Sequence, residues 1–178
     1  GHWPFDADAS DFSGNDYHGA FVGDAAIDNN AGTNQVGGGK LSLDGSGDLV
    51  DLAAHAAEFG PVTEGTIYAW INFTTTAEGA IFDLSDGIGN EYATFFVQNG
   101  LLRWNLRAGG TTHVSVSSTA TINDGSWHQV AVTTDGTGNH LYIDGAELTG
   151  VDVSYSAGTP TSTEFFDDLA TTTWMSIG

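Results

Sequence analysis

Short runs of β-branched and aromatic residues, separated by glycine-containing turns, recur along the chain and restrict its fold more than any other feature. Such runs favour strands, and their spacing of roughly 8–12 residues is typical of β-sandwiches. Asn99-Gly100 joins two of these runs, 92–98 and 101–106. Asn-Gly between apolar runs is a strong hairpin signal, because both central residues of the tight turn take positive φ. The sequence therefore predicts an all-β fold of about ten to twelve antiparallel strands.

The same pattern predicts the remaining strands. Segment 66–73 is rich in β-branched and aromatic residues, so we expect it to lie in the centre of a sheet. The stretch 44–47 joins two shorter runs and is expected to form a hairpin or a sharp corner. Helical spacing is weak and predicts only short turns within 51–59 and 164–169. Further strands are predicted at 40–43, 49–52, 80–84, 112–117, 127–133, 140–143 and 173–177.

The chain is strongly acidic, with 23 Asp and Glu residues against 3 Lys and Arg residues and a net charge of -20. The basic residues are Lys40, Arg103 and Arg107. A surface of this charge repels phosphate backbones and anionic lipid head groups, so we expect neither nucleic acid nor a membrane as a partner. No apolar run is long enough for membrane insertion. The length of 178 residues predicts one domain, 1–178, with a packed core.

The absence of cysteine excludes disulfides, zinc–thiolate sites and thiol nucleophiles. An animal secreted domain of this size would usually carry disulfides, so the composition favours a bacterial or archaeal protein. The acidic surface suits hydration in a high-salt or acidic environment. The first residues show no signal peptide. We expect a secreted or cell-surface protein, and this expectation rests on composition alone.

Several short motifs occur along the chain in a fixed order. The most specific is 124–131 (DGSWHQVA) followed by 141–145 (LYIDG). The others are 3–6 (WPFD), 11–15 (DFSGN), 17–19 (YHG), 38–45 (GGKLSLDG) and 67–71 (IYAWI). Together they resemble the bacterial laminin-G-like family of the concanavalin A-like lectin/glucanase superfamily. The resemblance covers about residues 3–178 and implies an antiparallel two-sheet β-sandwich, the concanavalin A-like jelly roll.

Members of this family usually continue past an Ile-Gly pair, here Ile177-Gly178, into a final strand that pairs near the N-terminal strand. The sequence stops at this pair. The resemblance therefore implies a jelly roll that lacks its last strand, receives it from elsewhere, or orders its strands differently. A sheet without that strand has an open edge, which offers a route to self-association.

The acidic loop 6–16 (DADASDFSGND) is the best candidate for a metal site. Calcium binds six to eight oxygens of carboxylates, amides and backbone carbonyls, and the resemblance implies a structural ion near the first loop. The alternative is a solvated acidic turn without an ion. A weaker candidate set is Asp83, Asp86, Asn90 and Glu91. The ligands we predict for structural calcium are Asp6, Asp11, Asn15 and Asp16.

A sugar-binding site needs aromatic platforms beside groups that form hydrogen bonds. Apolar neighbours place Trp3, Trp70 and Trp127 in the expected core. Trp104 alternates with Arg103 and Asn105, so one of its two strand faces is polar. The alternative to a ligand role is an inward-facing Trp104 with Arg103 and Asn105 toward water. The ligand-binding residues that we predict are Trp104, Tyr92, Arg103 and Asn90, with Arg107 nearby.

These observations favour a non-catalytic carbohydrate-binding module, with a polysaccharide or glycan as its partner. The alternative is an adhesion module of a large bacterial surface protein, which would bind a cell-surface protein. Glucanases on this sandwich need the motif Glu-x-Asp-x-(x)-Glu, which no glutamate here begins. A lyase is disfavoured because the acidic surface repels uronates. His128 is expected to be structural, and we predict no catalytic residues and no enzymatic activity.

Overall fold

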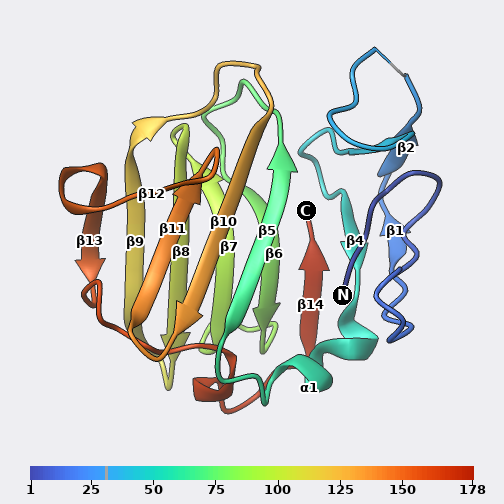
Figure 1. Ribbon diagram of the computed structural model, residues 1–178. Helices are drawn as coiled ribbons and strands as arrows, with labels where there is room; N and C mark the ends of the chain where they lie inside the picture. The colour runs from blue at the N-terminus through green and yellow to red at the C-terminus, as the bar shows by residue number, and fades with distance from the viewer. Residues whose placement is uncertain (31) are drawn as a thin grey trace.

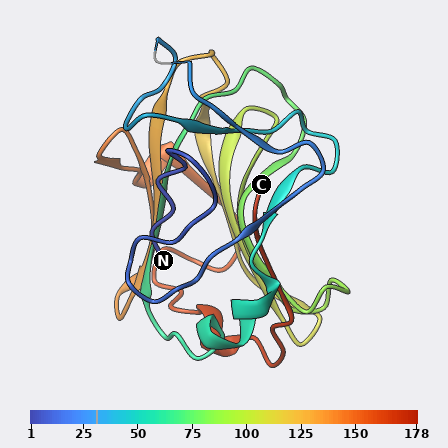
Figure 2. The ribbon, with the colours of Figure 1, turned by 90° about the vertical axis from the view of Figure 1, so that its right-hand side faces the viewer.

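The computed structural model describes residues 1–30 and 32–178 and places most strands in two stacked antiparallel sheets (Figure 1). The larger sheet has eight strands, the smaller has four, and β2 (Ala26–Asp28) pairs with β3 (Lys40–Ser42) in a separate ribbon. Figure 2 shows the two layers from the side, with the first segments of the chain crossing one end. The predicted all-β sandwich is confirmed.

The strand orders define the two layers. The eight-stranded sheet runs β1 (Ala20–Val22), β4 (Leu49–Asp51), β14 (Trp174–Ile177), β6 (Gly79–Ser85), β7 (Tyr92–Gln98), β8 (Leu101–Ala108), β9 (Thr111–Thr121) and β13 (Val153–Ala157). The four-stranded sheet runs β12 (Ala146–Glu147), β11 (Gly138–Ile143), β10 (His128–Asp135) and β5 (Gly65–Ile71).

Helical structure is limited to single turns, as the sequence predicts. A 3₁₀ turn at Ala53–His55 continues into α1 (Ala56–Phe59), and a second 3₁₀ turn spans Phe166–Asp168. A third, at Gly150–Asp152, was not expected. None of the helices in the described part of the chain has the length and hydropathy needed to cross a bilayer.

Alternation along β8 decides which side chains fill the space between the sheets. Leu102, Trp104 and Leu106 are fully buried, whereas the residues between them lie on the outer face. The Trp104 ring packs at 6.0 Å from that of Phe165, which stacks on Phe166 with ring centres 4.1 Å apart. The 3₁₀ turn at Phe166–Asp168 therefore places aromatic rings at one end of the core, where they fix the position of β8.

The hairpin predicted at Asn99-Gly100 is present. Asn99 has φ 56° and Gly100 has φ 78°, and Gln98 lies opposite Leu101 in the β7–β8 register. Positive φ at both central residues is the geometry that a two-residue turn needs. This turn sets the register between β7 and β8, the strands that carry the groove described below.

One prediction of strand arrangement is wrong, and the structure decides between the two alternatives for another. Segment 66–73 was expected at the centre of a sheet, but β5 lies at an edge and pairs only with β10. The runs 40–43 and 49–52 do not pair: β3 pairs with β2, whereas β4 pairs with β1 and β14. The stretch 44–47 is therefore the corner, not the hairpin. Strands β1, β2, β12 and β13 were not predicted, because the first three have only two or three residues and β13 contains two serines.

Strand β5 is an edge strand of the four-stranded sheet. Within residues 1–30 and 32–178, β5 has a partner on one side only. Its inward residues Ile67, Ala69 and Ile71 are only partly buried, although they pack against the core. Self-association through this edge stays a prediction.

Candidate ligand-binding groove

The outer face of the eight-stranded sheet carries polar and aromatic side chains that the register aligns in rows. Asp83, Thr94 and Asn105 lie side by side on β6, β7 and β8. Thr94 and Asn105 alternate with fully buried neighbours, so their side chains point away from the core. The adjacent row consists of Ser85, Tyr92 and Arg107.

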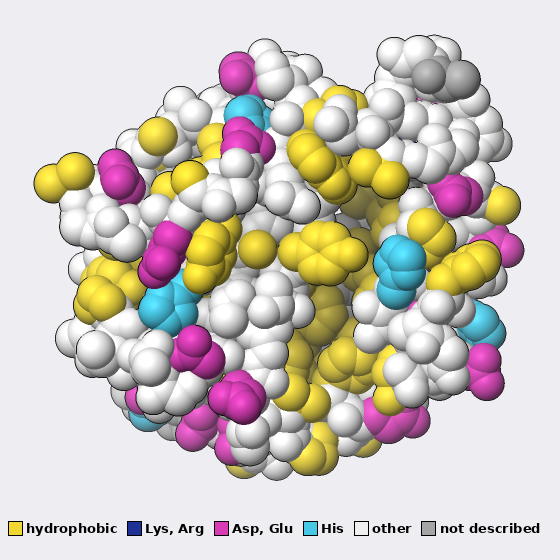
Figure 3. Space-filling model, in the orientation of Figure 1, with side chains coloured by type: hydrophobic (Ala, Val, Ile, Leu, Met, Phe, Trp, Pro, Cys, Tyr) yellow, Lys and Arg dark blue, Asp and Glu magenta, His cyan; other side chains and the backbone are white. Residues whose placement is uncertain are grey.

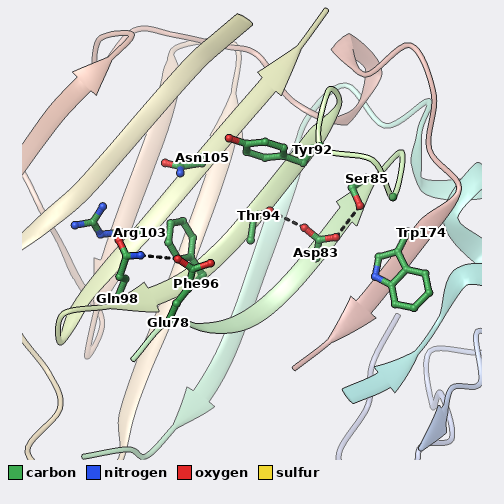
Figure 4. A pocket seen from close by; sticks show the side chains of 12 residues that line it. Glu78, Asp83, Ser85, Tyr92, Thr94, Phe96, Gln98, Arg103, Asn105 and Trp174 are labelled. Carbon is green, nitrogen blue, oxygen red and sulfur yellow. Dashed lines mark hydrogen bonds between the residues drawn. The ribbon is translucent and has the colours of Figure 1, made fainter. Parts of the chain in front are cut away.

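Apart from Arg107, the residues of these rows line a groove of about 720 Å³ that extends from Trp174 on β14 to Arg103 on β8 (Figure 4). Its aromatic side chains are Trp174, Tyr92 and Phe96. A volume of this size lies in the range of sites for small ligands. The groove thus combines flat apolar surfaces with hydrogen-bonding groups in one concavity.

Neighbouring donors fix the two carboxylates of the groove in position. Thr94 Oγ1 donates to Asp83 Oδ1 at 2.6 Å, and Ser85 Oγ donates to Asp83 Oδ2 at 2.9 Å. The side-chain amide of Gln98 donates to Glu78. An ionised carboxylate can accept about four hydrogen bonds, so both acids keep capacity for a further donor such as a sugar hydroxyl.

Three polar atoms on this face have no hydrogen-bond partner among the described residues. They are buried side-chain atoms of β8: Arg103 Nε, Asn105 Oδ1 and Arg107 Nε. Leaving a buried donor or acceptor unpaired costs about 1–3 kcal/mol, so such atoms are normally satisfied by water or a ligand. They mark the outer face of β8 as a surface with unused hydrogen-bonding capacity.

The structure brings together part of the predicted ligand-binding set. Tyr92 and Arg103 both line the groove. Asn90 precedes β7, does not line the groove, and uses its carbonyl to accept the Gly110 N–H at 3.2 Å. Trp104 has no exposed surface, so its prediction as a ligand-binding residue is wrong and the inward-facing alternative is right. The outward alternation of Asn105 and Arg103 is the signal that could have placed the groove correctly.

Two of the three tryptophans expected in the core lie outside it. Trp70 lies on the outer face of β5 with 37% of its surface exposed. Trp127 is partly buried and donates its Nε1–H to the Thr33 carbonyl at 3.0 Å, outside the core cluster. Trp3 is partly buried and packs against the core. Trp174, which lines the groove, was not predicted, because only the β14–β6 pairing brings it there.

Asp11 is the centre of loop 6–16, but its partners are hydrogen-bond donors of the protein. Oδ1 accepts the backbone N–H groups of His2 and Ser13 at 2.7 and 2.9 Å. Oδ2 accepts the Ser13 hydroxyl at 2.6 Å and the Tyr17 N–H at 3.1 Å. Burial opposes ionisation, but these hydrogen bonds outweigh it and hold the pKa of Asp11 well below its usual value. The Asp11 carboxylate is therefore saturated without a metal ion.

The other predicted calcium ligands do not converge on Asp11. Asp6 Oδ1 accepts the Gly38 N–H at 2.6 Å. Asn15 is exposed, and the Asp16 side chain is 90% exposed. The loop is thus closer to the alternative, an acidic turn held by hydrogen bonds. The weaker set around Asp83 is not assembled either, since Glu91 binds the Gly109 and Ala170 N–H groups instead.

A different acidic cluster forms where the β1–β2 turn meets the β3–β4 corner. One carboxylate oxygen each of Asp24, Asp44 and Asp48 lies within 4.8 Å of the other two. Asp48 is buried, whereas Asp24 and Asp44 are exposed. Three oxygens at this spacing could hold a metal ion. The sequence pattern predicts only a turn at 44–47 and gives no sign that its acidic side chains lie close to Asp24.

The opposite outer face, that of the four-stranded sheet, has a different character. Tyr68, Ala131 and Tyr142 lie in register across β5, β10 and β11, and Tyr68 is 61% exposed. Figure 3 views this side and shows apolar patches flanked by acidic and histidine side chains, with no Lys or Arg in view. This face is aromatic but has no basic side chain in view.

Comparison with solved structures identifies the fold. The chain resembles domain 4 of AbnA, an extracellular arabinanase of Geobacillus stearothermophilus, solved with arabinotriose (17% identity, TM-score 0.66, 96% of this chain and 78% of the other). It also resembles the receptor-binding domain of a botulinum neurotoxin C/D mosaic serotype (17% identity, TM-score 0.58, 95% of this chain and 40% of the other). The LG4-5 domains of mouse laminin alpha1 are 21% identical (TM-score 0.46, 64% of this chain and 27% of the other). The chain thus spans about a quarter of their length.

No curated protein matches the chain. Residues 44–174 match the family described as the concanavalin A-like lectin/glucanases superfamily, laminin G type. That superfamily includes both binding proteins and enzymes. The match covers most of the chain, and the jelly-roll sandwich agrees with it. The chain belongs to the laminin-G branch of the concanavalin A-like lectin/glucanase superfamily.

Proposed function

We propose that this domain is a non-catalytic carbohydrate-binding module that holds a short stretch of polysaccharide in the groove of the eight-stranded sheet. One observation carries the proposal: Tyr92, Phe96 and Trp174 share a single groove with Asp83 and Asn105. A sugar ring has an apolar face surrounded by hydroxyl groups, so it needs flat apolar contacts and hydrogen-bond partners together.

The arabinanase domain supports this proposal by analogy only. It shares the fold over nearly the whole of this chain, and its structure contains arabinotriose. Fold alone does not determine function, because this sandwich serves both lectins and enzymes. Arabinotriose is therefore a suitable first probe, together with xylo-, gluco- and galacto-oligosaccharides.

Isothermal titration with these oligosaccharides tests the groove. Tyr92→Ala and Trp174→Ala should each weaken binding at least about tenfold, since loss of an aromatic contact removes roughly 1–3 kcal/mol. Tyr68→Ala is the matched control, because Tyr68 is an exposed aromatic residue on the opposite sheet. Loss of binding in Tyr68→Ala but not in Tyr92→Ala would move the site to the other face.

The absence of catalysis needs its own test, because Glu78 and Asp83 both line the groove. Both carboxylates are fixed by neighbouring donors, an arrangement suited to positioning a ligand. We expect no new reducing ends when any bound oligosaccharide is incubated with the protein. Release of reducing ends that Asp83→Asn abolishes would instead show a glycoside hydrolase.

We also propose that calcium occupies the Asp24, Asp44 and Asp48 cluster as a structural ion. The close approach of three carboxylates supports it, since a divalent cation would neutralise their repulsion. Such an ion would tie the β1–β2 turn to the β3–β4 corner and leave the groove unaffected. The proposed location of the protein, secreted or at the cell surface, rests on the composition.

Adhesion through a protein partner is the second candidate function. The observation that favours it is the combination of the open β5 edge with exposed Tyr68 and Trp70 on the same strand. Unpaired strand edges pair readily with other strands. Sedimentation over a range of concentrations tests self-association through this edge, and Trp70→Lys should weaken it by placing a charge on the exposed face of the edge strand.

A further inference from the structure

Carboxylate side chains are unevenly distributed over the eight-stranded sheet. The neighbouring strands β7, β8, β9 and β13 contain no Asp or Glu, although the chain has 23 of them. Both arginines of the chain, Arg103 and Arg107, lie on β8 within this region. The part of the sheet next to the groove is therefore basic in an otherwise acidic molecule.

Neither arginine has an acidic partner in the described part of the chain, 1–30 and 32–178. Among the residues that the structure describes, neither guanidinium lies within 4.0 Å of a carboxylate oxygen, and the Nε atom of each is buried and unpaired. Lys40, the remaining basic residue, is in contrast paired, with Nζ 3.0 Å from Asp28 Oδ2. In a chain of net charge -20, unpaired arginines on one face require an explanation other than charge balance.

The surroundings of Arg103 suit an anionic ligand. Arg103 lies opposite Phe96 on β7 and opposite Ser117 on β9, so its neighbours in the register are an aromatic ring and a hydroxyl group. Asn105 lies two residues along the same face, with Oδ1 unpaired. Glu78 lines the groove but accepts a hydrogen bond from Gln98 and forms no ion pair with Arg103. Arginine has a planar fork of donors that matches a carboxylate group.

We infer that the saccharide in this groove carries a uronate carboxylate, which Arg103 binds. This inference rests on the proposed function of the same groove. Arg107 lies about 13 Å further along the strand at 3.3 Å per residue, so it does not share the carboxylate. Salt screens the acidic residues that lie more than roughly 8 Å away, and the two carboxylates of the groove itself are engaged by the neighbouring donors Thr94, Ser85 and Gln98.

The same electrostatics restrict the charge density of the ligand. A single uronate in the groove meets the unpaired Arg103, whereas a polyanion that extends beyond the groove meets the acidic remainder of the surface. The ligand is therefore a largely neutral polysaccharide with isolated uronate groups. A densely charged chain should bind more weakly than a sparsely charged one.

The test compares three matched probes by titration calorimetry: a xylo-oligosaccharide with one glucuronate side group, its carboxyl-reduced form, and the unsubstituted oligosaccharide. The wild-type domain should bind the first about tenfold more tightly than the other two, and 0.5 M NaCl should remove this preference. Equal affinity for all three probes overturns the inference but leaves the proposed function intact. If the domain binds none of the three probes and no other glycan, both the inference and the proposed function are overturned.

Variants locate the charge recognition. Arg103→Gln should lose the tenfold preference for the glucuronate probe over the neutral probe, whereas Arg107→Gln should keep that preference, because Arg107 lies beyond the screening length from the carboxylate. Lys40→Gln, which makes the same change of net charge elsewhere, should have no effect. If Arg103→Gln lowers the affinity for charged and neutral probes equally, with an unchanged melting temperature, Arg103 acts on the shape of the groove.

Two further probes separate a carboxylate from other anions. Polygalacturonate should bind more weakly than the singly charged oligosaccharide. A xylo-oligosaccharide with one sulfate should also bind more weakly than the one with a glucuronate side group. A preference for the sulfated probe would overturn the assignment to a carboxylate. Because the wild-type preference needs no variant, failure of Arg103→Gln to fold does not prevent the test.

Discussion

Asp48 accepts the backbone N–H of Asp24 through Oδ1 at 2.9 Å, and this bond joins the β1–β2 turn to the β3–β4 corner. Asp48 Oδ2 accepts the Asp44 N–H at 2.8 Å. A hydrogen bond with the Asp48 carboxylate, together with repulsion from Asp48 and Asp44, raises the pKa of Asp24. The crowding of negative charge is therefore unfavourable in the absence of a cation.

Calcium should stabilise the domain through this cluster. At a calcium concentration of about 100 times its Kd, the free energy of unfolding should rise by about 2.7 kcal/mol, and a chelator should reverse the increase. Asp44→Asn should remove most of the increase. Asp16→Asn, an exposed acid of loop 6–16, should keep it. A calcium response that survives in Asp44→Asn would exclude this cluster as the site. Calorimetric melting of the three proteins provides the measurement.

Asp11→Ala should destabilise the domain to the same extent with calcium and with chelator. The variant leaves the His2 and Tyr17 N–H groups without their acceptor, and a hydrogen bond to a charged group contributes about 1.5–3 kcal/mol. The low pKa of the Asp11 carboxyl makes its contribution fully present above about pH 4, and it disappears as the pH falls through the pKa of the folded state. Urea titrations at neutral pH, with and without calcium, test the claim. A loss seen only in calcium would restore loop 6–16 as a metal site.

Trp104→Ala should cost about 3–5 kcal/mol of stability, as expected for a fully buried aromatic residue in the core. Trp127→Ala should cost much less, about 1–2 kcal/mol, because Trp127 is only partly buried and loses one hydrogen bond to Thr33. Chemical denaturation of both variants measures the difference. Equal losses would mean that the ring of Trp127 contributes to the core as much as that of Trp104.

His128 should make stability depend on pH near neutrality. Burial opposes protonation of its ring, but hydrogen bonds with Asp144 at 2.8 Å and Asp124 at 3.3 Å outweigh it and raise the pKa of His128 above 6.5. Between this value and the higher pKa of the folded state, the folded protein binds more protons than the unfolded chain. The protonated ring therefore makes its full contribution to the free energy of unfolding below about pH 6.5, and this contribution is lost as the pH rises through the pKa of the folded state.

His128→Gln provides the measurement for this pH effect. The difference in melting temperature between wild type and variant should shrink between about pH 6 and pH 8.5. Asp144→Asn should reduce the same pH dependence, since Asp144 is a hydrogen-bond partner of the ring. A constant difference across this range would show that the protonated form of His128 is not stabilised by folding.

Local signals in the sequence predicted the fold well, because they depend on neighbours in the chain. Asn99-Gly100 is decisive without knowledge of any distant residue. The position of β5 is different: its aromatic residues indicate a strand but do not say whether one or two strands flank it. Tyr68 and Trp70 make this strand look like the interior of a sheet, although both lie on its exposed face.

The candidate sites were harder to predict because they join residues from distant parts of the chain. Asp24 and Asp48 meet only through the arrangement of β1 to β4, and Trp174 reaches Ser85 only through the β14–β6 pairing. Alternation correctly placed Trp104 and Arg103 on opposite faces of their strand. It did not show which face points into the core, because a tryptophan suits a sugar-binding surface as well as a core. Burial of Trp104 against Phe165 required the whole sandwich.

The strands without carboxylates also affect how the whole molecule orients. Because β7, β8, β9 and β13 have no acidic side chain and β8 has both arginines, we expect the domain to have a dipole moment with its positive end on the outer face of these strands. Adsorbed on a positively charged resin, it should attach through its other surfaces and leave the groove open to solution. Beside a polyanionic cell wall it should turn the opposite way, with the groove toward the wall.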